Sequence, residues 1–240
     1  MPIDIEDLLN RRTDLSTFVV HLTKDGDKPA KDNLLAILKA GAVKAGQPMG
    51  WVREQALEIG GDALESQRVV CFSETPLEHL YAMFAEIKDR EVKLQPFGIA
   101  FTKVVARRNG ANPVWYVNMT PGFDWVVSPA LNRLRKRAVR VGLHRDPAGC
   151  LFPYIEGMGD WRGSTGRRKE FWWEREWRHV GDFAFHMEDI ALVIAPASEH
   201  AEFDKISGGR TVDGSWSLER IIAKLSGVAA AGQVTPVSAH

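Results

Sequence analysis

The sequence predicts one α+β domain in which helices flank a mixed, mostly antiparallel sheet. Its two clearest helical segments come early, most strand segments come later, and the connections between them are long and irregular. That order is typical of antiparallel sheets rather than of a doubly wound parallel sheet. No G-x-G-x-x-G motif follows a strand segment and no P-loop is present. We place the domain at residues 1–225 and expect the small, polar residues 226–240 to form a flexible tail.

The first strand and the first helix follow one another near the start of the chain. The strand is expected at residues 17–22, where His21 and the apolar residues alternate between the two faces. The helix is expected at residues 32–40, with Asp32 as its N-cap and Gly41 as a left-handed C-terminal cap. The two patterns together predict a strand that turns directly into a helix.

The second unit repeats this order with a sharper helix start. A strand is expected at residues 68–73, and residues 75–78 read Thr-Pro-Leu-Glu, a capping box with proline at the first helical position. The helix that follows is expected to turn one apolar side inward. That side consists of Leu77, Leu80, Tyr81, Phe84 and Ile87.

The later part of the chain is mostly strand. Strands are expected at residues 97–103, 114–118, 174–180 and 190–195. The glycine-rich residues 157–166 are interpreted as a mobile loop. Ser217 is expected to cap a last helix, whose inward side consists of Leu218, Ile221, Ile222 and Leu225.

Composition favours a cytoplasmic protein. The longest uncharged apolar stretch, residues 190–197, is far shorter than the ~20 residues that a membrane helix needs. The N-terminus is acidic and lacks an apolar segment, so it is not a secretory signal. Cys71 and Cys150 form no C-x-x-C pair, which excludes a disulfide framework and gives no indication of a metal site.

Charge is spread unevenly although the net charge is zero. Residues 131–178 carry twelve Lys or Arg against six Asp or Glu, an excess of six positive charges. The segment from Arg133 to Arg137 has helical apolar spacing with Leu131 and Ala138, so one face is expected to pack while the basic face meets solvent. A basic middle on a neutral chain indicates either an anionic partner or a merely solvated face.

One late strand carries paired carboxylates. Strand alternation places Glu174, Glu176 and Arg178 on one face and Trp177 and His179 on the other. Two carboxylates on one face raise each other's proton affinity unless a cation such as Arg178 offsets the repulsion. Such a site suits the stabilisation of a developing positive charge, for example an oxocarbenium ion.

Four short motifs stand in strand or helix context along the chain: His21-Leu22-Thr23, the helix that ends at Gly41, Ser73-Glu74-Thr75, and Glu174-Arg175-Glu176. In this order they resemble the ADP-ribosyltransferase fold, whose mixed, mostly antiparallel sheet is split and flanked by helices. Residues 19–41 are similar to the DarT-type enzymes, which modify DNA. Residues 70–84, 97–101 and 174–178 are most similar to the AbiGi-type abortive-infection family, whose members are often labelled antitoxins.

The resemblance implies NAD as the substrate, no metal, and a role for each motif. His21 would bind the adenosine-side ribose of NAD, with Thr23 and Tyr81 as further candidates for cofactor contacts. Ser73 would brace the catalytic glutamate. Glu176 would bind the nicotinamide ribose and stabilise the oxocarbenium ion as nicotinamide leaves. Glu174 would activate or orient the acceptor. Histidine-type members generally lack the paired glutamates, and Tyr81 is only a candidate for the tyrosine that they stack on nicotinamide.

The function that follows is an NAD-dependent toxin of a bacterial phage-defence or toxin–antitoxin system, with an antitoxin as a possible partner. Nucleic acid is the expected acceptor, reached through the basic residues from Arg133 to Arg140 and the segment from Gly157 to Arg168. A catalytically inert binding module of the same fold and a protein-modifying enzyme are the alternatives. A nuclease is disfavoured because no Asp, Glu or His cluster has metal-ligand spacing.

These residues can also be explained by the structure alone, without a functional role. A histidine in a strand is often a satisfied structural group, and Thr75 alone is explained by the capping box. Glu174 and Glu176 would also be explained by ion pairs with Arg175 and Arg178 on a solvated edge strand.

Overall fold

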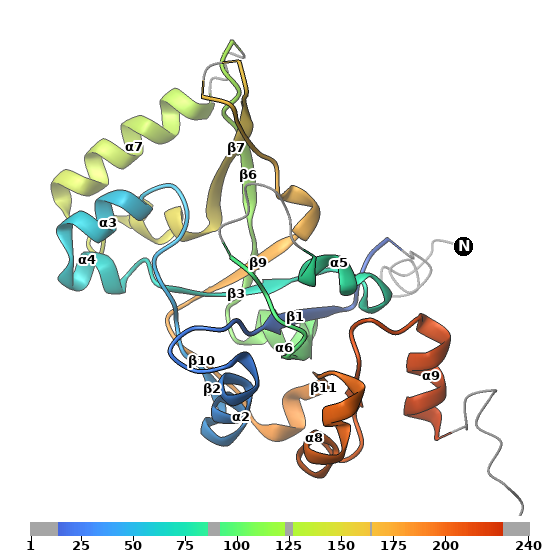
Figure 1. Ribbon diagram of the computed structural model, residues 1–240. Helices are drawn as coiled ribbons and strands as arrows, with labels where there is room; N and C mark the ends of the chain where they lie inside the picture. The colour runs from blue at the N-terminus through green and yellow to red at the C-terminus, as the bar shows by residue number, and fades with distance from the viewer. Residues whose placement is uncertain (1–13, 86–91, 123–126, 164, 228–240) are drawn as a thin grey trace, which may run out of the picture.

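The computed structural model describes residues 14–85, 92–122, 127–163 and 165–227 (Figure 1). Its main feature is a seven-stranded sheet in which only the pairing of the two strands at one edge is parallel. In spatial order the strands are β12 (Thr211–Val212), β11 (Ile190–Ile194), β4 (Gly98–Thr102), β1 (Phe18–Leu22), β3 (Val69–Ser73), β9 (Glu176–Val180) and β5 (Asn112–Pro113). The mixed, mostly antiparallel α+β prediction is therefore confirmed.

The pairing of β1 with its two neighbours is unequal. It pairs with β4 along its whole length, from Phe18 to Leu22, but its register with β3 is the single pair Val20 and Ser73. Since β3 pairs with β9 along all five of its residues, the sheet consists of two well-paired halves joined by a short contact.

The remaining strands in the described residues form two smaller sheets. One contains β6 (Trp115–Asn118), β7 (Ile155–Trp161) and β8 (Arg167–Lys169), and the other pairs β2 (Ala42–Val43) with β10 (Phe183–Ala184). The expectation of a mobile loop at residues 157–166 was wrong for its first half, because residues 157–161 belong to β7. Glycine is needed there for close approach: a Cβ atom on Gly159 would lie 2.8 Å from the amide nitrogen of Thr120.

Helices cover the sheets on several sides. They are α2 (Ala30–Ala40), α3 (Arg53–Ile59), α4 (Gly61–Glu65), α5 (Tyr81–Phe84), α6 (Lys103–Arg108), α7 (Val127–Val141), α8 (His200–Ser207) and α9 (Leu218–Ser226). Six 3₁₀ turns occur in the described ranges: η1 (Leu77–His79), η2 (Pro147–Cys150), η3 (Phe152–Tyr154), η4 (Trp172–Glu174), η5 (Met187–Asp189) and η6 (Ala197–Glu199). Gly41 ends α2 in the predicted left-handed conformation, with φ 62°. Asp32 is not the N-cap, because the helix begins two residues earlier, where the amide of Ala30 donates to Asp25 Oδ1 at 2.9 Å.

The predicted capping box at residues 75–78 does not form. The Thr75 hydroxyl lies 2.7 Å from Ser73 Oγ instead of capping the helix, and the chain makes only η1 and the four residues of α5. Leu80 is buried as expected, but Tyr81 is 57% exposed and does not belong to the inward side. Ile87 lies outside the described residues.

Three apolar clusters fill the interior. On β1, Val19 belongs to a cluster with α2, β10 and α8, whereas Val20 belongs to one with α5, β12 and α9. Both faces of this strand are therefore buried, as its central place in the sheet requires. The third cluster joins α3, α4 and α7 to the three-stranded sheet.

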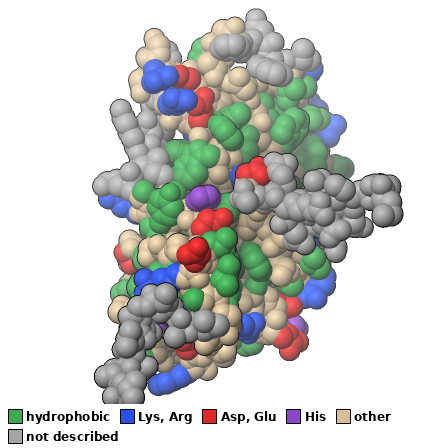
Figure 2. Space-filling model, turned by 90° about the vertical axis from the view of Figure 1, so that its right-hand side faces the viewer, with side chains coloured by type: hydrophobic (Ala, Val, Ile, Leu, Met, Phe, Trp, Pro, Cys, Tyr) green, Lys and Arg blue, Asp and Glu red, His purple; other side chains and the backbone are tan. Residues whose placement is uncertain are grey.

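The last helix is capped as predicted, since Ser217 Oγ accepts from the amide of Arg220. Its packing differs from the expectation: Ile221 is buried, but the other apolar residues of the helix remain exposed. They are Leu218, Ile222 and Leu225. Figure 2 shows the side of the molecule on which α5 and α9 lie in Figure 1, with hydrophobic side chains across its middle next to a small acidic group. Residues 228–240 lie outside the described part, and no helix within that part is long and apolar enough to cross a membrane.

Candidate functional site

Two of the predicted catalytic residues meet where β3 ends and β9 begins. Ser73 and Glu176 are direct register partners in this antiparallel pair, and Cys71 is the partner of Arg178. Residues directly opposite each other in an antiparallel pair project to the same face of the sheet. The four side chains therefore share one face, and strand alternation correctly predicted that Glu176 and Arg178 lie together.

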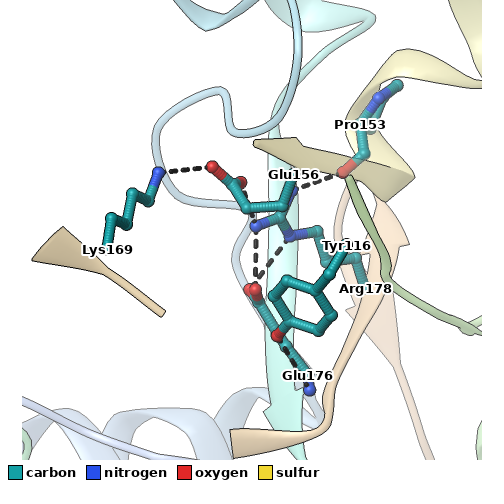
Figure 3. A network of polar contacts seen from close by, with 6 residues as sticks. All are labelled: Tyr116, Pro153, Glu156, Lys169, Glu176 and Arg178. Atoms are coloured by element: carbon teal, nitrogen blue, oxygen red, sulfur yellow. Dashed lines mark hydrogen bonds and ion pairs between the residues drawn. The ribbon is translucent and has the colours of Figure 1, made fainter. Parts of the chain in front are cut away.

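The carboxylate of Glu176 is held by a buried guanidinium (Figure 3). Arg178 donates to its two oxygens from Nε at 2.9 Å and from Nη2 at 2.8 Å. Arg178 is fully buried, and it also donates to the carbonyl oxygen of Pro153 and to Glu156 Oε2, each at 2.7 Å. Lys169 completes the network by donating to Glu156 Oε1 at 2.5 Å. Two carboxylates and two cations thus form one continuous chain.

The charges of this network support one another. Burial by itself lowers the pKa of Arg178, but the charge and hydrogen bonds of Glu176 outweigh it and raise that pKa above its usual value. Burial likewise favours a higher pKa for Glu156, but Arg178 and Lys169 outweigh it and hold that pKa below its usual value. Both groups are therefore ionised at neutral pH, and loss of either partner leaves an uncompensated buried charge.

Tyr116 joins this network from the three-stranded sheet. Its hydroxyl accepts a hydrogen bond from the amide of Glu176 at 3.3 Å. Burial and the charge of Glu176 raise the pKa of the phenol, so it stays protonated. Tyr116 and Glu156 are register partners in the parallel pair of β6 and β7, which directs both toward β9. The sequence predicted the strand of Tyr116 but held no signal for its partner.

A pocket of about 230 Å³ lies beside this end of β9. Its lining combines aromatic rings with charged groups: Glu74, Pro113, Val114, Tyr116, Trp172, Arg175, Glu176 and Trp177. Trp172 is 57% exposed, so its ring stays available to a bound molecule. Sites for drug-sized ligands usually measure ~300–1,000 Å³. This pocket therefore suits one ring or sugar of a larger ligand rather than a whole dinucleotide.

Glu174 does not share a strand face with Glu176, contrary to the prediction. It lies in η4, and Arg175 follows in a left-handed conformation with φ 48° before β9 begins. The bend is held by β3, because Ser73 Oγ donates to the carbonyl oxygen of Glu174 at 2.7 Å. Ser73 thus braces the main chain before Glu176 and not its carboxylate.

His21 projects to the face opposite Glu176. Val20 is the register partner of Ser73, so the next residue in β1 points the other way. There the ring of His21 packs edge-on against Phe72 at 5.9 Å, and Nδ1 donates to the carbonyl oxygen of Cys71 at 2.9 Å. Burial lowers the pKa of His21, so the imidazole is neutral at physiological pH. The structure does not join His21 to the Glu176 pocket.

The other two candidates for cofactor contacts also lie apart from the pocket. Thr23 is buried, and its hydroxyl lies within hydrogen-bond distance of the carbonyl oxygens of Ala30 and Phe97. Those contacts tie the end of β1 to the start of α2. Tyr81 is exposed on α5, where its ring lies beside His79. Neither side chain lines the pocket.

The basic helix α7 lies behind the three-stranded sheet as seen from the pocket. Its buried residue Leu131 packs in the same cluster as Val117 and Ile155, which alternate with Tyr116 and Glu156 along β6 and β7. The exposed cations of α7 project away from that sheet. They are Arg133, Lys136, Arg137 and Arg140, of which Arg137 is paired with Asp146. The structure therefore gives no support to the expected path from the residues between Arg133 and Arg140 to Glu176.

The hairpin of β7 and β8 lies closer to the site, and three of its cations are matched by carboxylates. Arg162 pairs with Asp160, and Arg168 pairs with Glu170. Lys169 is bound by Glu156, as described above. These three cations therefore add little unpaired positive charge beside the pocket.

No protein-family model, curated protein or solved structure matches the chain. Within the described residues, no three His, Cys, Asp or Glu side chains are grouped so that they would hold a metal ion. The resemblance to ADP-ribosyltransferases therefore stays a prediction that rests on short sequence motifs. What the geometry adds is a carboxylate held by a buried guanidinium beside a small pocket with aromatic walls.

Proposed function

We propose that the protein cleaves NAD at the Glu176 pocket and transfers the ADP-ribose to an acceptor. The observation that carries this proposal is the Glu176 carboxylate, which Arg178 holds beside a pocket walled by Tyr116, Trp172 and Trp177. A carboxylate fixed in place before the reaction stabilises a developing positive charge without the cost of reorganisation. Aromatic walls suit the flat nicotinamide ring, which is cationic in NAD.

In the proposed reaction the bond between the nicotinamide nitrogen and the ribose C1′ breaks, and its electron pair leaves with nicotinamide. The ribose becomes an oxocarbenium ion, which the negative charge of Glu176 stabilises. Water or an acceptor oxygen then forms the new bond to C1′ and releases a proton. Arg178 occupies one lone pair on each oxygen of Glu176, so about two of the four acceptor sites of the carboxylate remain for a ribose hydroxyl.

Glu174, in the turn before β9, is the residue that the resemblance assigns to the acceptor. The position of α7 gives no support to a nucleic-acid path, and water or a protein side chain would need no basic surface. A toxin role in phage defence or in a toxin–antitoxin pair belongs to the same proposal and rests on the resemblance alone.

A catalytically inert module of the same fold is the second candidate. It is favoured by two observations: Glu176 already has a buried partner in Arg178, and His21 lies on the opposite face. In that reading the network of charges only holds the three-stranded sheet against β9.

Nicotinamide release separates the two candidates. Purified protein would be incubated with NAD alone and then with DNA, RNA or a cell protein extract, and free nicotinamide would be measured. The proposal predicts release with NAD alone, because water serves as the acceptor, and covalent ADP-ribose on one of the added polymers. No release under any of these conditions would favour the inert module.

A further inference from the structure

Glu74 is a buried carboxylate that none of the motif assignments uses. It directly follows β3 and is only 6% exposed. Three groups surround its oxygens: the indole Nε1 of Trp177 at 2.8 Å, the ammonium of Lys103 at 2.7 Å and the guanidinium of Arg175 at 3.3 Å. A carboxylate with this many donors is a fixed part of the structure rather than a solvated surface group.

Two of these three partners are the immediate neighbours of Glu176 in the sequence. Arg175 precedes it and Trp177 follows it, and the amide of Glu74 also donates to the carbonyl oxygen of Arg175 at 3.2 Å. Glu74 therefore contacts the residues on both sides of Glu176. It does so from the face opposite the Arg178 network, because it follows Ser73, the register partner of Glu176.

The contacts of Glu74 hold a strained bend at Arg175. Arg175 is the one non-glycine residue with a positive φ among the residues that the structure describes. The left-handed conformation is unfavourable for a residue with a Cβ atom. A second contact helps to hold it, since Arg175 Nη1 donates to the carbonyl oxygen of Asp14 at 2.8 Å. The bend separates Glu174 from β9 and sets where the strand that carries Glu176 begins.

We propose that Glu74 is a positioning residue, which sets Glu176 in the pocket by holding Arg175 and Trp177. This inference rests on the proposed NAD cleavage, for which Glu176 is the group that must be placed. Glu74 lines the pocket, but its oxygens are already bound by Trp177, Lys103 and Arg175. It therefore acts through these neighbours, so its loss lowers the turnover number and leaves the Michaelis constant for NAD nearly unchanged. A displacement of ~1 Å in a reacting group costs about 100-fold in rate.

The variant Glu74→Gln keeps the volume and removes the charge that Lys103 and Arg175 require. Asp146→Asn is its matched control, because Asp146 is a similarly buried carboxylate, 5% exposed, whose arginine partner Arg137 lies far from the pocket. We expect Glu74→Gln to lower the turnover number 10- to 100-fold, with less than a threefold change in the Michaelis constant. Asp146→Asn should lower the melting temperature without a loss of turnover. A higher Michaelis constant at unchanged turnover, or a turnover equal to that of the control, would overturn the proposal.

A measurement without substrate keeps the proposal testable if the wild type releases no nicotinamide, the result that would refute the proposed function itself. Nitrogen–proton NMR spectra report the indole N–H of Trp177 and the amide of Glu176, which donates to the Tyr116 hydroxyl. In Glu74→Gln both resonances should move, whereas in Asp146→Asn both should stay in place. A Glu176 amide that stays in place in Glu74→Gln would contradict the positioning role whatever the activity.

Discussion

Glu74, which is buried, and Glu176, which is half-buried, are carboxylates at the same end of β3 and β9. They differ in how their partners are arranged along the chain. Glu176 is bound by Arg178, two residues further along its own strand. Glu74 is bound by Trp177, which is 103 residues away, and by Lys103 at the start of α6. The first arrangement follows from strand alternation, whereas the second exists only once β1, β3, β4 and β9 have assembled. Local pattern therefore predicts one half of the site and tertiary pairing supplies the other half.

The largest expected effect comes from breaking the Glu176 network at its centre. Arg178→Met keeps much of the volume and removes the cation that contacts both Glu176 and Glu156. Loss of one partner of a buried ion pair typically costs about 3–5 kcal/mol, so the melting temperature should fall by on the order of 10 °C at pH 7. Arg108→Met is the control, because Arg108 is 61% exposed in its pair with Asp189 and should cost at most ~1 kcal/mol.

The pH dependence of the same variant gives a second check. Arg178 and Lys169 hold the pKa of Glu156 below its usual value, and without Arg178 burial and the charge of Glu176 raise it. The loss of stability relative to the wild type is then smallest toward the unfolded pKa of glutamate, about 4, and grows as the pH rises through the raised folded pKa. Unfolding by denaturant from pH 4 to pH 8 should show the variant approaching the wild type toward the acid end. A deficit that does not change with pH would mean that lost packing, not charge, accounts for the effect.

A smaller effect is expected for His21, on the other face of the sheet. His21→Ala removes the hydrogen bond to the carbonyl oxygen of Cys71, and the free energy of unfolding should fall by about 1 kcal/mol. Nicotinamide release should keep its Michaelis constant for NAD within about twofold, because the imidazole points away from Glu176. A rise of tenfold or more would restore the cofactor-binding role that the resemblance implies.

The smallest effect is expected for the exposed cations of α7. Replacement of Arg133, Lys136 and Arg140 by glutamine should leave nicotinamide release within about twofold of wild type, because these residues lie behind the three-stranded sheet. Any nucleic-acid binding by this face would weaken and lose part of its salt dependence, since each phosphate contact contributes a slope of about −0.9 for duplex DNA. Loss of ADP-ribose transfer to nucleic acid, with hydrolysis unchanged, would show that α7 does guide an acceptor.

These contrasts also explain how much of the fold could be read from the sequence. The alternation at residues 17–22 and 68–73 and the caps at Gly41 and Ser217 depend on local chemistry, and each was predicted correctly. The capping box failed because the Thr75 hydroxyl contacts Ser73, two residues earlier, and Ser73 in turn donates to the carbonyl oxygen of Glu174, 101 residues away. Gly157 and Gly159 serve close contacts with other segments, and a mobile loop has the same local signature.

The candidate site likewise has a part that local patterns predict and a part that depends on tertiary contacts. Alternation correctly paired Glu176 with Arg178, but it wrongly assigned Glu174 to the same strand. The bend at Arg175 separates Glu174 from β9, and this bend is fixed by a contact with β3 that alternation does not contain. Alternation also described the two faces of β1 correctly. It could not show which face of β1 lies on the same side of the sheet as the Glu176 side chain, because the register between strands is set only when the sheet forms. Tyr116 and Glu156 were missed for that reason.

The most direct test of the account compares nicotinamide release by the wild type with release by Glu176→Gln. The substitution keeps the volume and removes the negative charge, and Glu170→Gln is the control because Glu170 pairs with Arg168 outside the pocket. The account predicts measurable release by the wild type and by the control, and a loss of at least 100-fold in Glu176→Gln, on the scale of a lost transition-state charge contact. The folded fraction of each protein would be confirmed by its unfolding curve. Equal release by all three proteins would contradict the assignment of Glu176.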